Sequence, residues 1–169
     1  ERGYEALSIP AISTTAGVSN QTFYEHFRSK RDAFLAAFDE LVGETLQVAA
    51  AAFASAGDEP EAIGIGLRAI LEHIAANELV GKVAILELPV AGADALDRGD
   101  AVLNSFTAFL APGTVPSQFT HTVPEVVREA IGGGIFGVIQ HEIVSGRGAE
   151  LPELAPELTR LALMPLDPA

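Results

Sequence analysis

The sequence predicts an all-α protein in which a helix-turn-helix module precedes a larger helical domain. Apolar residues recur at helical spacing along nearly the whole chain, and no stretch alternates between apolar and polar residues as a half-buried strand does. The chain has 169 residues, of which 49% are hydrophobic, and it contains no Cys. This composition suits a buried helical core and excludes a disulfide scaffold.

Two short helices are expected at the N-terminus. The first covers residues 8–16, with Ser8 as its N-cap and Pro10 in its first turn, where a missing N–H costs little. Gly17 supplies the left-handed residue that ends this helix. The second covers residues 19–27 and begins at a further capping serine.

Longer helices follow in the rest of the chain. Ser29 and Asp32 form a capping-box-like pair that opens a helix over residues 30–55. A break at residues 57–60 precedes an amphipathic helix that ends near Asn77. Its apolar stripe consists of Ile63, Leu67, Ile70, Leu71 and Ile74. The remaining predicted elements are helices over 79–88, closed by Pro89, and over 93–110, 124–145 and 156–164, with a loop over 111–123.

Charge is distributed unevenly along the chain, whose net value is -13. Residues 1–31 hold four basic and three acidic side chains, a balance of +1, so residues 32–169 carry -14. A near-neutral tip on an acidic body would present the tip to a phosphate backbone, although an acidic surface is also an ordinary means of solubility.

The sequence gives no indication of catalysis, a metal or a cofactor. His121 and the pair His141-Glu142 lack the short ligand spacing of a metal site, and no Gly run is followed by the Lys-Ser/Thr of a nucleotide loop. No apolar run has the length of a membrane span, and residues 1–30 lack the layout of a signal peptide. We therefore expect a cytoplasmic protein that is no enzyme and has no membrane partner.

The two short helices, joined by Ala16-Gly17-Val18-Ser19, have the layout of a helix-turn-helix, in which the second helix lies in the DNA major groove. Short polar side chains crowd the first turn of that helix, and Val18, Phe23 and Phe27 are expected to face inward. The expected DNA-binding residues are Ser19 at the helix start, Asn20, Gln21 and Thr22 for bases, and Ser8, Tyr24, His26 and Lys30 for phosphates. On spacing alone, a helical hairpin with polar caps explains the same pattern.

A longer string of residues favours the DNA-binding helix-turn-helix over the plain helical hairpin. It consists of Glu1-Arg2-Gly3-Tyr4, Ser8-Ile9, Ala16-Gly17-Val18-Ser19, Thr22-Phe23-Tyr24, His26-Phe27 and Ser29-Lys30. Over about the first forty residues this string resembles the TetR family of bacterial repressors. The sequence departs from the family in two ways: the first helix of the family pattern is incomplete, and Pro10 stands where several members place a polar or basic side chain.

The resemblance implies a DNA-binding module over residues 1–40 and a ligand-binding and dimerisation domain over residues 41–169. It further implies a homodimer on a palindromic double-stranded DNA operator, acting as a repressor that a small apolar effector releases. Two alternatives remain open at this point, namely a helical ligand-binding or dimerisation module without DNA binding and, with less support, a helical-bundle enzyme.

Two sets of residues in the larger domain are candidates for these roles. The candidate ligand-pocket residues are Phe53, Leu67, Leu71, His73, Leu86, Phe106, Phe109, Phe136 and Gln140, and Glu87 and Asn104 are further polar candidates. The candidate dimer-interface residues are Gly133, Gly137, Leu158 and Leu161. Plain core packing is the alternative for each apolar member, and a kink beside a ligand cavity is the rival explanation of the glycines.

Overall fold

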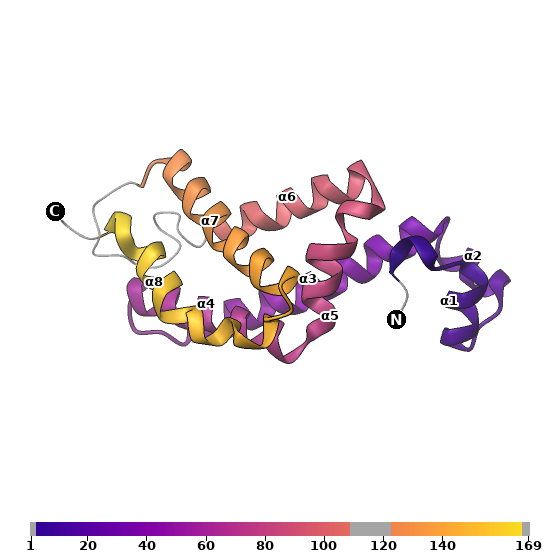
Figure 1. Ribbon diagram of the computed structural model, residues 1–169, viewed down its shortest axis with the longest axis horizontal. Helices are drawn as coiled ribbons and strands as arrows, with labels where there is room; N and C mark the ends of the chain where they lie inside the picture. Colours follow the sequence, from indigo (N-terminus) through magenta and orange to yellow (C-terminus); the bar gives the residue numbers. More distant parts are fainter. Residues whose placement is uncertain (1–2, 109–122, 167–169) are drawn as a thin grey trace.

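A computed structural model describes residues 3–108 and 123–166, and these residues form helices and turns without a strand. The predicted all-α fold is confirmed. The molecule is elongated: α1 and α2 form one end, and α3 runs from them into a body built from α3 to α8 (Figure 1). None of the described helices is long and apolar enough to cross a membrane.

The N-terminal end consists of three short elements, η1 (Tyr4–Ala6), α1 (Ile9–Ala16) and α2 (Asn20–His26). Both predicted serine caps are present, because the Ser8 Oγ accepts from the N–H of Ala11 at 3.3 Å and the Ser19 Oγ accepts from the N–H of Thr22 at 3.0 Å. Gly17 ends α1 with φ 70°, as predicted for a left-handed residue. Local sequence therefore fixes the angle between α1 and α2.

The body contains longer helices joined by short connections. In order these are α3 (Lys30–Ala54), α4 (Glu59–Ala76), α5 (Glu78–Gly81), η2 (Lys82–Glu87), η3 (Pro89–Ala91), α6 (Ala93–Ala108), α7 (Glu125–Val144), η4 (Gly148–Leu154), α8 (Ala155–Leu163) and η5 (Met164–Leu166). The Ser29 Oγ accepts from the N–H of Asp32 at 3.1 Å, and the Asp32 carboxylate accepts from the N–H of Arg28 at 2.9 Å. The predicted pair thus opens α3. The predicted loop falls almost entirely outside the described residues.

The expectation of one regular helix over residues 79–88 is wrong. After α5 the chain forms a π-helix, η2, in which the N–H of Leu88 donates to the carbonyl of Val83 five residues earlier at 3.0 Å. Pro89 cannot donate a backbone hydrogen bond, so a regular α-helix cannot continue through it with its hydrogen bonds intact. Isolated π turns often occur at functional sites, and η2 lines a cavity described below.

Three groups of buried side chains hold the helices together. The first joins α3 to η2, η3 and α6 and consists of Leu35, Phe38, Val42, Leu88, Ala91 and Ala95. The second joins α4, α7, η4 and α8 and consists of Leu71, Ile139, Leu151, Ala155 and Leu158. The third consists of Ile63, Ile131 and Ala162. The first group lies where α3 leaves the helix-turn-helix, so it sets the position of that module on the body.

Leu71→Ala tests whether this side chain belongs to the core. Leu71 is fully buried, so its truncation is expected to lower the free energy of unfolding by about 2–5 kcal/mol. Leu79→Ala is the matched control, because Leu79 is 56% exposed and its loss is expected to cost less than about 1 kcal/mol. Urea unfolding at one fixed protein concentration measures both values, and equal losses would contradict the assignment.

Candidate functional site

The polar start of α2 faces solvent. Ser19, Asn20 and Gln21 are exposed and Thr22 is half-buried, with the hydroxyls of Ser19 and Thr22 3.0 Å apart. On the other side of the helix Phe23 is buried, and its ring lies 5.4 Å from that of Phe27. This anchor leaves the hydrogen-bonding groups of the first turn available for an external partner.

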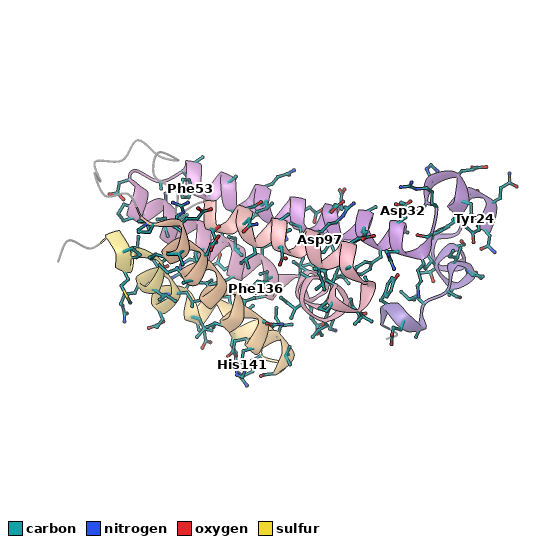
Figure 2. The ribbon with its side chains drawn as sticks, turned by 90° about the horizontal axis from the view of Figure 1, so that it is seen from above. Tyr24, Asp32, Phe53, Asp97, Phe136 and His141 are labelled. Atoms are coloured by element: carbon teal, nitrogen blue, oxygen red, sulfur yellow. The ribbon has the colours of Figure 1, made fainter. Side chains whose placement is uncertain are left out.

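The side chains expected to contact phosphates differ in their availability. Tyr24 is 58% exposed and lies at the tip of the molecule, as Figure 2 shows, and Ser8 and His26 are also exposed. The side chain of Arg28 is 93% exposed, with its Nε 3.7 Å from the Asp32 carboxylate. Sequence reasoning counted Arg28 only in the charge balance, although its place just after α2 is a usable signal. Val18, expected to face inward, is 42% exposed.

Lys30 has a different position from the one expected of a phosphate contact. Its Nζ donates to the carbonyls of Tyr4 at 2.8 Å, Leu7 at 3.0 Å and Glu5 at 3.4 Å. It also lies 4.3 Å from the centre of the Tyr4 ring, within the range of a cation–π contact. Three carbonyls already accept hydrogen bonds from the ammonium, so the side chain holds η1 against the start of α3.

A second contact ties η1 to the body. The N–H of Tyr4 donates to the Glu87 carboxylate at 2.6 Å, and the Tyr4 ring lies 5.0 Å from that of Phe34 on α3. A Cβ at Gly3 would lie 2.8 Å from the same carboxylate, so the backbone approaches Glu87 closely. Glu87, a candidate pocket residue, therefore contacts the N-terminal turn and ends the π-helix η2.

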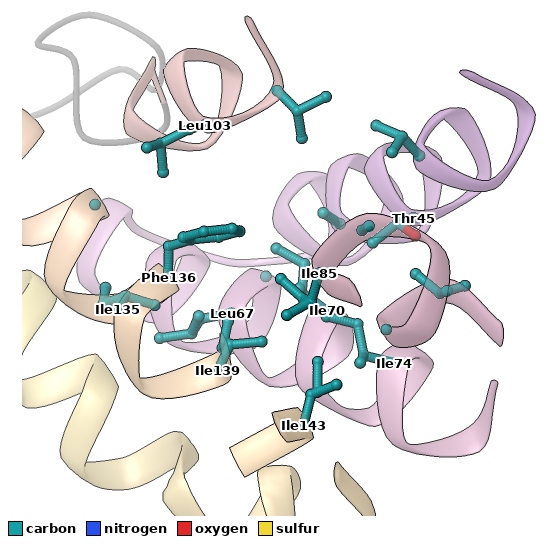
Figure 3. A pocket seen from close by; sticks show the side chains of 18 of the residues that line it. Thr45, Leu67, Ile70, Ile74, Ile85, Leu103, Ile135, Phe136, Ile139 and Ile143 are labelled. Atoms are coloured by element: carbon teal, nitrogen blue, oxygen red, sulfur yellow. The ribbon is translucent and has the colours of Figure 1, made fainter. Parts of the chain in front are cut away.

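The body contains an apolar cavity of about 130 Å³. Its walls come from α3, α4, α5, η2, α6, α7 and α8, and Figure 3 shows the side chains that line it. The lining residues are Val42, Thr45, Ala49, Phe53, Ile63, Gly66, Leu67, Ile70, Ile74, Val80, Gly81, Ala84, Ile85, Val102, Leu103, Gly132, Ile135, Phe136, Ile139, Ile143 and Ala162. Among these, only Thr45 has a polar side chain, and its hydroxyl donates to the Leu41 carbonyl at 2.9 Å. The cavity thus favours an apolar group.

The candidate pocket residues fall into several places. Phe53, Leu67 and Phe136 line the cavity. Leu71 does not, because it is fully buried in the core group shared by α4, η4 and α8. Leu86 lies outside the cavity, in a second pocket on the surface.

The remaining candidates are away from the cavity or outside the described side chains. Gln140 and Asn104 are exposed, and neither lines the cavity. His73 does not line it either, and its buried Nε2 has no hydrogen-bond partner among the described residues. The Phe106 side chain and Phe109 lie outside what the structure describes.

The candidate interface residues divide in the same way. Gly133 and Gly137 are exposed on α7, and a Cβ at either would meet open space. The expectation that Leu158 lies at the dimer interface is wrong, because this side chain is buried within the chain against α4 and α7. Leu161 is half-buried and packs on the group around Ile63. Within residues 3–108 and 123–166, nothing covers the face of α7 that carries Gly133 and Gly137.

Ion pairs link α3 to α6 along the surface. Arg98 donates to the Asp39 carboxylate, and this hydrogen bond raises the pKa of the Arg98 guanidinium above its ordinary value. Arg31 lies 3.4 Å from the carboxylate of Asp94. All four side chains are at least 45% exposed, so each pair contributes little to stability.

Comparison with known proteins agrees with this architecture. Residues 1–37 match the model of a family described as bacterial regulatory proteins, tetR family. No curated protein sequence matches the chain.

Three solved structures share the fold. The fatty acid degradation regulator FadR from Bacillus halodurans aligns with a TM-score of 0.80 and 22% identity, covering 96% of this chain and 87% of that one. The transcriptional regulator FadR from Bacillus subtilis, solved in complex with stearoyl-CoA, aligns with a TM-score of 0.81 and 18% identity over 98% and 91%. The TetR family regulator PfmR from Thermus thermophilus aligns with a TM-score of 0.67 and 17% identity, covering 98% of this chain and 92% of that one.

Lys30→Met tests the structural role of the ammonium. Without its three bonds to carbonyls, η1 is expected to open more often, so the amides of Ala6 and Leu7 should exchange with deuterium at least about threefold faster. Arg28→Met is the matched control, because its side chain is almost fully exposed and does not contact η1. Unchanged exchange in Lys30→Met would contradict the role assigned to Lys30.

Proposed function

We propose that this chain, whose residues 1–37 match the model of the tetR family of bacterial regulatory proteins, is a TetR-type homodimeric repressor of transcription. Residues 1–40 bind a palindromic operator, and residues 41–169 form the dimer and bind the effector. The effector carries an aliphatic chain, and its binding releases the repressor from DNA. The observation that carries the proposal is the exposed polar face of α2 joined through α3 to an apolar cavity in the body.

DNA binding is assigned to the exposed groups of the module. Asn20, Gln21 and Thr22 read base edges, because they occupy the first turn of the helix that enters the major groove. Ser8, Tyr24, His26 and Arg28 hold phosphates. In the dimer two copies of α2 lie about 34 Å apart, one turn of DNA.

The chemistry of the cavity supports an aliphatic effector. Its walls offer no free hydrogen-bonding side chain among the described residues, so a polar ligand would lose its hydration without replacement. The similar Bacillus subtilis regulator was solved with stearoyl-CoA, whose acyl part is such a chain. The two proteins share 18% identity, so the chain length and head group of the effector must be argued from the residues of this protein.

The size of the cavity indicates how binding is coupled to DNA. A volume of about 130 Å³ is close to that of an engineered cavity that holds benzene, so a longer chain must press on the walls or extend past them. Ala84 and Ile85 of η2 are part of those walls, and Glu87 of the same helix holds the N–H of Tyr4. Movement of η2 would shift this contact and, with it, the helix-turn-helix. An effector changes the DNA affinity only if it binds the two arrangements differently.

Selection of bound DNA from a random pool tests the DNA-binding role. The intact protein is expected to enrich a palindrome, and Gln21→Ala should enrich a sequence that differs at one position in each half-site. Arg28→Gln should leave the enriched sequence unchanged but reduce the slope of log affinity against log salt by about 0.9 for each phosphate that the variant no longer binds. No enrichment by the intact protein, or an unaltered preference in Gln21→Ala, contradicts the assignment.

Glu87→Ala tests the coupling. The variant should bind dodecanoate as the natural protein does, because Glu87 does not line the cavity, yet dodecanoate should change its operator affinity less than half as much on a free-energy scale. Calorimetry measures the first quantity and fluorescence anisotropy of labelled operator the second. Glu40→Ala is the control, because Glu40 is exposed on α3. A full response in Glu87→Ala rules out this route.

A further inference from the structure

A second pocket of about 320 Å³ lies on the surface beside the cavity. The two share three lining residues, Ile74, Gly81 and Ile143. In Figure 3 the side chains of Ile74 and Ile143 lie together at the end of the cavity opposite Leu103. This wall alone is common to both spaces, so we call the second space the outer pocket and the three residues the partition.

The three residues of the partition lie close together. A Cβ at Gly81 would lie 2.9 Å from the Cδ1 of Ile143 and 3.5 Å from the Cγ2 of Ile74, so the backbone of α5 touches the tips of both side chains. Rotation of the Ile143 side chain, which is only half-buried, would widen the passage between the two spaces. Gly146 and Gly148, which line the outer pocket, leave room on its far side.

A long effector chain would need a connection between the cavity and the outer pocket, because the cavity alone is too small for it. The cavity of about 130 Å³ holds only a benzene-sized part of it, whereas the outer pocket of about 320 Å³ is more than twice as large. The outer pocket also differs in chemistry, because Glu78 and Lys82 are among the residues that line it. One end of the joined space is therefore apolar and the other is charged.

The ammonium of Lys82 is the group in the outer pocket that suits an anion. Its Nζ lies 2.8 Å from the Glu78 carboxylate, and the two side chains are 47% and 81% exposed. Such an exposed pair on one helical stretch contributes little to stability, so a ligand carboxylate beside Lys82 can compete with Glu78 for the ammonium. Elsewhere from residue 31 onward, Arg31, Arg68, Arg98, Arg147 and Arg160 pair with carboxylates, and Arg128 donates to a backbone carbonyl. This single ammonium fits a compact anionic head.

We infer that the cavity and the outer pocket are the two ends of one site for a single-chain amphiphile with a compact anionic head. The aliphatic chain passes the partition into the cavity, and the head lies beside Lys82. Ile143 acts as the gate between them. The inference rests on the proposed function, because it takes the occupant of the cavity to be an aliphatic chain.

Binding of two ligands that differ only in the head group tests the position of the head. Dodecanoate and dodecanol are titrated into the intact natural protein, Lys82→Gln and Arg68→Gln. Lys82→Gln is expected to bind dodecanoate roughly tenfold more weakly, the loss of one charge-assisted hydrogen bond, and dodecanol within about twofold of the natural protein. Arg68→Gln is the matched control, because Arg68 forms a similar exposed pair with Glu72 but lines neither space.

Stopped-flow association of the same ligands tests the gate. Ile143→Trp is expected to slow the association of both ligands at least about fivefold and Ile143→Ala to accelerate it, since access depends on the side chain that must move. Val144→Trp is the control for a bulky substitution in the same turn of α7, because Val144 is 63% exposed. The two Ile143 variants carry opposite expectations, so a folding defect in one leaves the other decisive.

The outcomes separate this inference from the proposed function. If the natural protein binds neither ligand, the aliphatic effector is wrong and the inference falls with it. If both ligands bind but Lys82→Gln weakens them equally or not at all, the head lies elsewhere and only the inference is overturned. If the association rates are unchanged in both Ile143 variants, the role of Ile143 as a gate is wrong.

Discussion

The structure depends on the contact between the N–H of Tyr4 and the carboxylate of Glu87 at 2.6 Å. A carboxylate that accepts from a backbone N–H makes a stronger bond than a neutral acceptor does. Because 83 positions separate the two residues, this bond and the adjoining apolar group around Phe38 define how the helix-turn-helix sits on the body. Glu87 also ends the π-helix that lines the cavity, so one short segment contacts both the N-terminal turn and the cavity wall.

Charge is divided between the near-neutral N-terminal tip and the acidic body. The body beyond residue 31 carries -14, and its arginines are engaged by neighbouring carboxylates or a backbone carbonyl. Such a surface would repel DNA phosphates, which favours the tip around α2 as the face of the proposed DNA contact. The same surface would also repel a polyanionic ligand. An apolar cavity therefore gains most from a ligand whose charge is small and remains at the rim.

Local signals predicted the helix starts and ends well. The capping serines Ser8, Ser19 and Ser29 bind amides three residues away, so the sequence within one turn contains the whole interaction. The role of Lys30 could not be found in this way, because its partners are carbonyls 23 to 26 residues earlier. Leu71 and Leu67 illustrate the limit for the cavity. Both belong to the apolar stripe of α4, and only the packing of α8 and η4 decides that one fills the core and the other lines the cavity.

The glycines of α7 have different surroundings on different faces of the helix. Gly132 lines the cavity, and a Cβ there would collide with the Thr107 side chain of α6, so this glycine allows the close approach of two helices in one chain. Gly133, Gly134 and Gly137 have open space where a side chain would be. Each lowers helix propensity by up to about 1 kcal/mol relative to Ala, and no described residue supplies a compensating contact. A close approach by the same helix of a second copy would supply that compensation, which is why the face of Gly133 and Gly137 remains the predicted dimer contact while Leu158 does not.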